Sequence, residues 1–129
     1  MNQESYRLLR ATYPDLKQPL LEFDQFRPWQ ADKKEILIQQ GDPTSIVRFM
    51  ISGLARLFFV DDGGNEQTKF FLQPGFFLVP MYSLFLEKES WFSIQASTPC
   101  HGVAIDAKTF KRLLRTDRQW ANYWICYMT

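Results

Sequence analysis

The sequence predicts a mainly β protein, an antiparallel sandwich or barrel with helices at both ends. Between about residues 29 and 106, short runs of β-branched and aromatic residues replace the helical spacing found at the two ends. Glycine-based turn signals recur about every eleven residues in this region, at positions 41, 53, 63–64 and 75. Short strands at this spacing favour an antiparallel sheet over a parallel sheet with crossover helices.

The first 28 residues are predicted to form a helical flank. Aromatic and leucine side chains recur at helical spacing from Tyr6 until Pro14 ends the run. A second short helix is expected from Pro19, a residue tolerated in a first turn, and Pro28 ends it. We therefore expect the β region to begin at residue 29.

The β region, residues 29–106, is predicted from short strand-like runs between turn residues. The expected strands cover residues 35–39, 46–52, 54–60, 67–72, 91–97 and 102–105. Residues 61–65, Asp-Asp-Gly-Gly-Asn, are the strongest turn signal, because Asp-Gly and Gly-Asn supply the positive φ that a hairpin needs. The runs on either side of this turn are expected to pair.

Residues 107–129 are predicted to return to helix. Asp106 is a suitable N-cap before an apolar stripe at positions 107, 110, 113 and 114. A second helix is expected from Arg118 to Thr129, with Asp117 as its cap. Its apolar residues spread too widely for a lone surface helix and no stop signal follows them. We expect this helix to pack on a partner and the natural chain to continue.

Composition excludes several classes of protein. The chain has 129 residues, 46% of them hydrophobic, and a formal net charge of +1, which fits one folded domain and excludes disorder. A near-zero charge disfavours a protein that coats a polyanion. The N-terminus lacks the apolar core of a signal peptide, and no apolar run could span a bilayer. We expect a cytoplasmic protein with no membrane partner.

Few side chains could carry catalysis or hold a metal. Cys100 and Cys126 are too few for a disulfide framework, an iron–sulfur cluster or a four-ligand metal site, and are expected to be reduced, buried thiols. His101, the only histidine, would point to the opposite face of its strand from Cys100, so the two do not form a nucleophile and base. His101 could supply one axial haem ligand, but nothing else supports haem. We expect no enzyme, no metal and no cofactor.

The charged clusters have simple interpretations. Asp61-Asp62 and the Glu87/Glu89 pair fall in predicted turns and are expected to be solvated. Five basic residues lie between positions 108 and 118, but no helix-turn-helix pattern accompanies them. We interpret them as the solvated face of a helix rather than a nucleic-acid-binding stripe.

Several motifs share the spacing of one known family. They are Lys34-Glu-Ile-Leu-Ile-Gln-Gln-Gly-Asp42, Val47-Arg-Phe-Met-Ile-Ser-Gly-Leu-Ala-Arg56, Asp61-Asp-Gly-Gly-Asn-Glu66, Phe71-Leu-Gln-Pro-Gly75, Ser93-Ile-Gln-Ala96, and Ile105-Asp106 leading into Phe110. Residues from about Lys33 to Leu114 thus resemble the cyclic nucleotide-binding domain at the N-terminus of Crp/Fnr-type bacterial transcription regulators. The resemblance implies a jelly-roll-like β-roll, or double-stranded β-helix, flanked by N- and C-terminal helices.

The resemblance also implies an effector-sensing and dimerisation domain. The final helix would begin the dimerisation helix, and a homodimer would form through it. We expect its contacts to be Trp120, Tyr123, Trp124, Tyr127 and Met128. DNA would be bound only through a helix-turn-helix domain absent from this chain.

The phosphate-binding cassette departs from the family pattern. Nucleotide-binding members read roughly Phe-Gly-Glu-Leu and then Arg-Ser-Ala or Arg-Thr-Ala, whereas this chain places Val79-Pro80 and Ser90-Trp91 at those points. Without the arginine no fork-shaped cation balances the phosphate charge. Pro80 lacks an amide donor and cannot replace the carboxylate that holds the ribose. We predict that neither cAMP nor cGMP binds.

Two interpretations of this degenerate cassette remain. Residues 76–86 could have become a hydrophobic plug that belongs to the core, with Trp91 filling the ligand space. Alternatively a remodelled pocket holds a small uncharged or weakly acidic effector, with Tyr82, Ser83, Ser90 and Gln95 as its polar groups. The candidate pocket residues are Phe77, Val79, Pro80, Met81, Tyr82, Ser83, Ser90, Trp91 and Gln95.

Two other functions are alternatives for this sequence. A stand-alone protein–protein interaction domain with a filled pocket would share the fold and use association as its output. A cupin-type enzyme would also be a β-roll, but it needs two or three histidines and a carboxylate for its metal, and this chain has one histidine.

Overall fold

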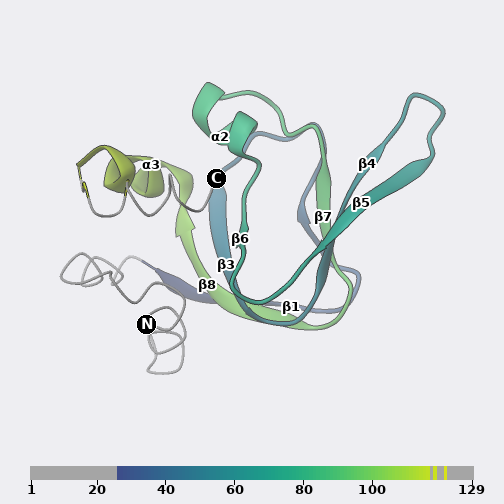
Figure 1. The fold of residues 1–129 in the computed structure, drawn as a ribbon, viewed down its shortest axis with the longest axis horizontal. Helices are drawn as coiled ribbons and strands as arrows, with labels where there is room; N and C mark the ends of the chain where they lie inside the picture. Colours follow the sequence, from purple (N-terminus) through teal and green to yellow (C-terminus); the bar gives the residue numbers. More distant parts are fainter. Residues whose placement is uncertain (1–25, 117, 119–120, 122–129) are drawn as a thin grey trace.

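The computed structural model describes residues 26–116, Arg118 and Ala121, and places eight strands in two four-stranded antiparallel sheets (Figure 1). The first sheet has the order β1 (Arg27–Ala31), β8 (Cys100–Asp106), β3 (Ile46–Ser52), β6 (Phe77–Leu78). The second has the order β2 (Ile36–Ile38), β7 (Ser93–Ala96), β4 (Ala55–Val60), β5 (Glu66–Leu72). The predicted mainly β, antiparallel β-roll is confirmed.

Some boundaries differ from those predicted. β1 was not expected, and it begins at Arg27, so the β region starts two residues before the predicted boundary. Pro28 is tolerated there because β1 pairs only with β8, and an edge strand does not need every amide donor. The short strand β6 and the helix α2 (Met81–Leu86) were also not predicted. The predicted helices within residues 1–25 lie outside the described residues.

The β4–β5 hairpin forms as expected and projects from the body of the roll (Figure 1). The Asp61 carboxylate accepts hydrogen bonds from the backbone amides of Gly63 and Asn65, both at 2.9 Å. Hydrogen bonding, chiefly from the backbone of Asn65, lowers the pKa of Asp61. The turn residues thus stabilise their own hairpin, as the Asp-Asp-Gly-Gly-Asn sequence predicts.

The first sheet separates two hydrophobic cores. Alternation along β3 directs Phe49 to one face, where its ring lies 5.0 Å from that of Phe77, and Phe77 lies 5.9 Å from Phe110 of α3 (Ala107–Thr116). Met50 points to the other face, into a core shared with buried residues of the second sheet. We call these the helix-side core and the inter-sheet core.

The C-terminal helix α3 follows the sequence prediction. The Asp106 carboxylate accepts hydrogen bonds from the amide of Thr109 at 3.0 Å and from its hydroxyl at 2.7 Å, so Asp106 is the expected N-cap. Ala107, Phe110 and Leu113 are buried in the helix-side core. The predicted dimer contacts, Trp120, Tyr123, Trp124, Tyr127 and Met128, lie outside the described residues, as does Cys126.

Candidate functional site

The connection between β6 and β7 occupies the place predicted for the degenerate cassette. It contains α2, a six-residue helix that begins after Pro80 and ends at Glu87 in the left-handed conformation, with φ of 54°. Ser83 and Leu84 of α2 are buried, whereas its aromatic and leucine side chains at positions 82, 85 and 86 are exposed. The plug interpretation therefore holds for only part of residues 76–86.

The hydroxyls of the two candidate-pocket serines, Ser83 and Ser90, form hydrogen bonds within the protein. The Thr44 hydroxyl lies 2.7 Å from that of Ser83, and the Ser83 hydroxyl donates to the carbonyl of Lys88. The Ser90 hydroxyl donates to the carbonyl of Phe92 at 2.7 Å. Both serines are buried, so their hydroxyls hold the connection in shape rather than face a ligand.

Most of the other predicted pocket residues also do not face a shared pocket. Phe77 lies in the helix-side core, Val79 and Met81 pack against it, and Pro80 is buried. Gln95 accepts a hydrogen bond from Arg56 Nε at 2.9 Å on the opposite face of the second sheet from the inter-sheet core. Of the nine predicted residues, the structure leaves only Tyr82 and Trp91 extensively exposed. It does not bring the nine together.

Trp91 belongs to an aromatic cluster that reaches the β4–β5 hairpin. Its ring lies 6.2 Å from that of Phe59 and 4.9 Å from that of Phe92, and Lys69 Nζ lies 5.2 Å from the Phe59 ring centre. Phe59 packs against the inter-sheet core, so this cluster lies on the face of the second sheet that bears that core. We call this face the concave side. Trp91 remains 52% exposed, so it does not fill a buried ligand space.

Phe70 is on the same concave side, and Phe71 is not. Phe70 is paired in register with the buried Leu57, whereas Phe71 is paired with Arg56, and paired residues share a face. Both phenylalanines are 52% exposed. The sequence offered the Phe-Phe pair but no signal for which ring faces inward.

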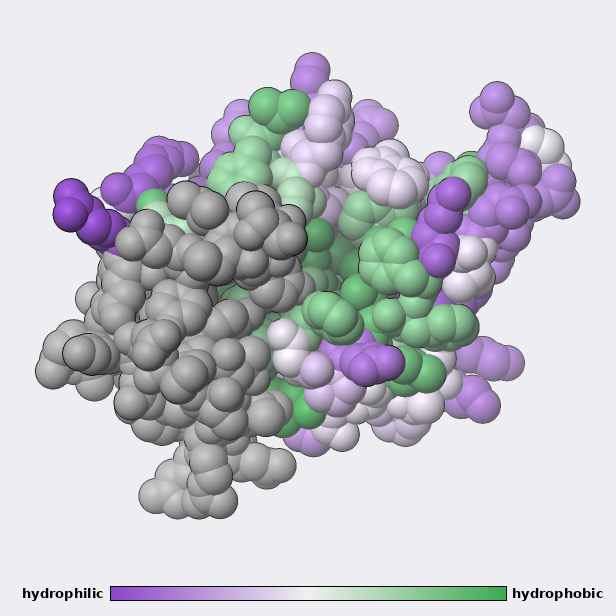
Figure 2. Space-filling view, viewed as in Figure 1, coloured by the Kyte–Doolittle hydropathy of each residue, from purple (hydrophilic) through white to green (hydrophobic). Residues whose placement is uncertain are grey.

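We call a set of apolar side chains on the β6–β7 connection, beside it and on the β4–β5 hairpin the aromatic surface; all are exposed except the half-buried Phe59. Figure 2 shows hydrophobic residues between α2 and the β4–β5 hairpin on this face. The aromatic surface comprises Phe59, Phe70, Phe76, Tyr82, Phe85, Leu86 and Trp91. Exposed apolar side chains gathered on one face, as Figure 2 shows, are a feature of binding sites.

The β6–β7 connection, which bears much of the aromatic surface, carries little positive charge. The connection at residues 76–92 has one cation, Lys88, between Glu87 and Glu89, and no arginine. Glu87 is paired with Lys111 of α3, Nζ to Oε1 at 3.3 Å. The local charge therefore disfavours a phosphate ligand.

The described residues contain neither a metal-ligand cluster nor a membrane-spanning helix. Within residues 26–116, 118 and 121, no three His, Cys, Asp or Glu side chains gather as metal ligands. In the same part of the chain no helix is long and apolar enough to cross a membrane. Cys100 is a free, buried cysteine and His101 beside it is exposed, as strand alternation predicts. Burial raises the pKa of the Cys100 thiol, which keeps it unreactive.

Comparisons with known proteins identify the fold. The family model described as "Cyclic nucleotide-binding domain" matches residues 28–117. No curated protein matches the chain by sequence.

Solved structures with the same fold include bacterial regulators. The Thermus thermophilus catabolite activator protein is 24% identical with a TM-score of 0.76, and the alignment covers 91% of this chain and 55% of that one. The sensor domain of the transcriptional regulator DNR from Pseudomonas aeruginosa is 17% identical with a TM-score of 0.77, covering 95% and 84%.

A eukaryotic regulatory domain has the same fold. The regulatory domain of Toxoplasma gondii PKA, crystallised with cAMP, is 18% identical with a TM-score of 0.73, covering 85% of this chain and 43% of that one. This chain thus spans about half the length of the activator and less than half of the kinase regulatory domain. At these identities the similarities establish the fold alone.

Proposed function

The chain belongs to the family of cyclic nucleotide-binding domains, and on that premise we propose that it is the effector-sensing and dimerisation domain of a Crp/Fnr-like transcription regulator. Its effector is a small uncharged or weakly acidic molecule that binds at the aromatic surface, and neither cAMP nor cGMP binds. DNA is bound by another domain of the regulator. The similarity to the DNR sensor domain supports the regulatory role.

The observation that carries this proposal is that three backbone amides of the β6–β7 connection donate hydrogen bonds within the protein. A cyclic phosphate needs a cation and free amide donors. Here the amide of Leu84 donates to the Pro80 carbonyl at 2.9 Å, and that of Lys88 to the Ser83 carbonyl at 3.3 Å. The amide of Ser90 donates to the Asp42 carbonyl at 2.8 Å. These three amides are therefore not available to a phosphate, and the connection itself, residues 76–92, contains no arginine.

The aromatic surface favours an apolar effector because it offers apolar area that a ligand can bury. The rings of Phe59, Phe70 and Trp91 offer apolar area on the concave side, and burying it against a ligand contributes roughly 25 cal/mol per Å². The Lys69 ammonium above Phe59 could tolerate a weakly acidic group.

Calorimetric titration tests the nucleotide part of the proposal. We expect no heat of binding for cAMP or cGMP, which corresponds to a dissociation constant above about 1 mM. A micromolar dissociation constant for either nucleotide would contradict the proposal.

An uncharged fluorescent probe, N-phenyl-1-naphthylamine, tests the aromatic surface. We expect the probe to brighten on binding, and Phe70→Ser to weaken its binding about tenfold, because a buried ring contributes one to three kcal/mol. Phe71→Ser is the matched control, with the same exposure on the opposite face of the strand. Equal loss in both variants would show nonspecific adhesion and remove the pocket from this surface.

Sedimentation tests the dimer. We expect the chain to associate through the predicted final helix and Trp124→Asp to abolish that association, because a charge at an apolar seam is costly. Lys108→Gln, an exposed change on α3, serves as the control. Unchanged association in Trp124→Asp would remove the predicted seam.

A further inference from the structure

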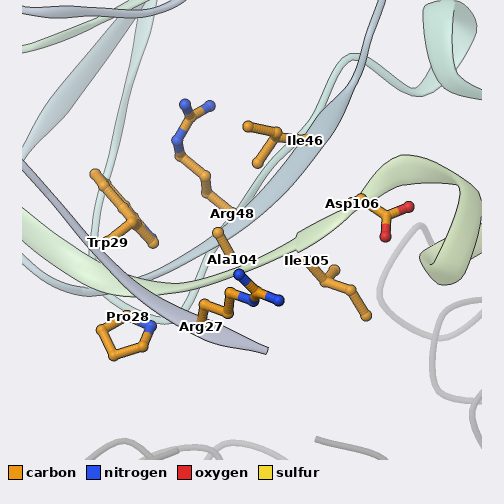
Figure 3. A pocket seen from close by; sticks show the side chains of 8 residues that line it. All are labelled: Arg27, Pro28, Trp29, Ile46, Arg48, Ala104, Ile105 and Asp106. Carbon is orange, nitrogen blue, oxygen red and sulfur yellow. The ribbon is translucent and has the colours of Figure 1, made fainter. Parts of the chain in front are cut away.

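A second opening lies on the first sheet. It is a cavity of about 630 Å³, which we call the arginine cavity (Figure 3). Its described lining residues, all from β1, β3 and β8, are Arg27, Pro28, Trp29, Ile46, Arg48, Ala104, Ile105 and Asp106. Small-molecule sites in proteins have volumes of about 300–1,000 Å³, so the arginine cavity can hold a small ligand.

Strand register places two arginines around a small residue. Ala104 of β8 is paired with Arg27 of β1 on one side and with Arg48 of β3 on the other. The three residues form one row across the sheet and share a face. Figure 3 shows the two arginine side chains on either side of Ala104. The methyl group of Ala104 leaves open the space that a larger side chain would fill between them.

Arg48 is held in place with most of its donors unused. Its Nη1 donates to the carbonyl of Leu37 at 2.9 Å, and its guanidinium carbon lies 5.6 Å from the centre of the Trp29 ring. A guanidinium has five N–H donors, and this is the one hydrogen bond that Arg48 makes among the described residues. The arginine is fixed by Leu37 and Trp29 and keeps donors for a ligand.

The charge of Arg48 is poorly balanced. Burial lowers the pKa of its guanidinium, and the charge of Glu35 partly offsets this effect. Neither Arg48 nor Arg27 forms an ion pair with a described carboxylate. Asp106 also lines the cavity, but both its carboxylate oxygens accept hydrogen bonds from Thr109. The cavity therefore has a net positive character that an anion would neutralise.

We propose that the arginine cavity binds a small organic anion, with its carboxylate or phosphate group between Arg27 and Arg48 and its apolar body against Trp29 and Ile46. Ile46 is 40% exposed at the cavity and offers apolar contact. The site shares no lining residue with the aromatic surface, so it does not depend on the function proposed above.

Three probes separate the anionic group from the apolar body: phenyl phosphate, inorganic phosphate and benzyl alcohol. The readout is the indole N–H resonance of Trp29, identified by its loss in Trp29→Phe, because this N–H sits in the cavity wall 3.4 Å from the Phe49 carbonyl. We expect phenyl phosphate to shift this resonance saturably and to bind about tenfold more tightly than inorganic phosphate. Benzyl alcohol is expected to cause no saturable shift.

Variants test whether the arginines hold the anion. We expect Arg48→Gln to weaken phenyl phosphate binding about tenfold or more, and Arg27→Gln to weaken it roughly threefold to tenfold, because hydrogen bonds to ionised groups are the strong ones. Lys33→Gln, which removes an exposed cation of the β1–β2 turn, is the matched control and should leave affinity unchanged. Repeating the titration with benzoate compares the affinity for a carboxylate with the affinity for a phosphate.

The outcomes decide the proposal even if Arg48→Gln fails to fold. Arg27 is exposed, so its replacement leaves the core intact and decides the question by itself. Equal affinity of Arg27→Gln and Lys33→Gln for phenyl phosphate, or saturation without a shift of the Trp29 resonance, would overturn the site.

Discussion

The aromatic surface and the arginine cavity are two openings of one β-roll that are built in different ways. The arginine cavity stands on three neighbouring strands, and cross-strand pairing sets the places of Arg27, Ala104 and Arg48. Much of the aromatic surface stands on the β6–β7 connection, whose shape depends on buried hydroxyls such as that of Ser83. Strand pairing fixes a site rigidly, whereas a connection held by a few side-chain bonds can adjust to its ligand.

The two openings also differ in charge. The connection has one cation between two acids, whereas the cavity has two arginines and one acid that already serves as a helix cap. Ligand preference should differ accordingly, with apolar molecules at one opening and anions at the other. Three substitutions probe the differences in rigidity and charge between the two openings, beginning with the one of largest expected effect.

Strand β8 should not tolerate added atoms at Gly102, the register partner of the cavity residue Trp29. A Cβ at Gly102 would lie 1.9 Å from the carbonyl oxygen of Phe49 and 3.0 Å from Trp29 Nε1. The oxygen belongs to paired strand β3 and cannot move without disturbing the β3–β8 pairing. We expect Gly102→Ala to lower the free energy of unfolding by about 3 kcal/mol or more, measured by urea denaturation.

Gly41→Ala is the control for that loss. Gly41 has a φ of +92°, but a Cβ there would meet nothing within 4 Å. Its substitution adds backbone strain alone and should cost about 1 kcal/mol. Equal losses in the two variants would mean that the close approach of Phe49 and Trp29 to Gly102 does not constrain the strands beneath the cavity.

The hydroxyl of Ser83 should matter less and act locally. Ser83→Ala leaves the Thr44 hydroxyl and the Lys88 carbonyl without their partner, which costs about 1–2 kcal/mol. Hydrogen exchange should quicken at the amides of Leu84 and Lys88 more than in β3 and β8, because the connection can open without the sheet. Ser52→Ala, an exposed change, is the control. Uniform acceleration across the protein would contradict a separately adjustable connection.

The sequence predicted the scaffold because the scaffold depends on local patterns. Turn residues such as those at 61–65 make their own hydrogen bonds, and Asp106 caps α3 within three residues. The unpredicted elements lacked such patterns. Because Pro28 was interpreted as the end of a helix, the edge strand β1 was not predicted. The helix α2 is too short to show helical periodicity.

The candidate site was harder to predict because it depends on long-range geometry. Trp91 and Gln95 share parity along the predicted strand, but β7 begins only at Ser93, so Trp91 contacts Phe59 on the concave side while Gln95 contacts Arg56 on the other. The arginine cavity brings together residues from β1, β3 and β8, and no sequence spacing reveals that register.

The smallest effect is expected at Asp106, the acid on the cavity rim. Hydrogen bonds from Thr109, first from its side chain and then from its backbone, lower the pKa of Asp106 below its ordinary value of 3.8. A lowered pKa stabilises the folded protein above the unfolded pKa, and this stabilisation is lost as pH falls through the folded value. Asparagine caps helices equally well but carries no charge, so Asp106→Asn should cost only about 0.5 kcal/mol at pH 7, with solvent screening the exposed carboxylate.

Two measurements on Asp106→Asn use this small effect to separate the openings. Thermal unfolding from pH 7 to pH 3 should show the difference between wild type and variant shrinking, and a difference that grows instead would contradict the assigned shift. Removing the carboxylate takes away the one acid among the described lining residues of the cavity, so phenyl phosphate affinity should rise about twofold at low salt. Binding of N-phenyl-1-naphthylamine at the aromatic surface should stay unchanged, because that opening binds through apolar contact and Asp106 lines only the cavity.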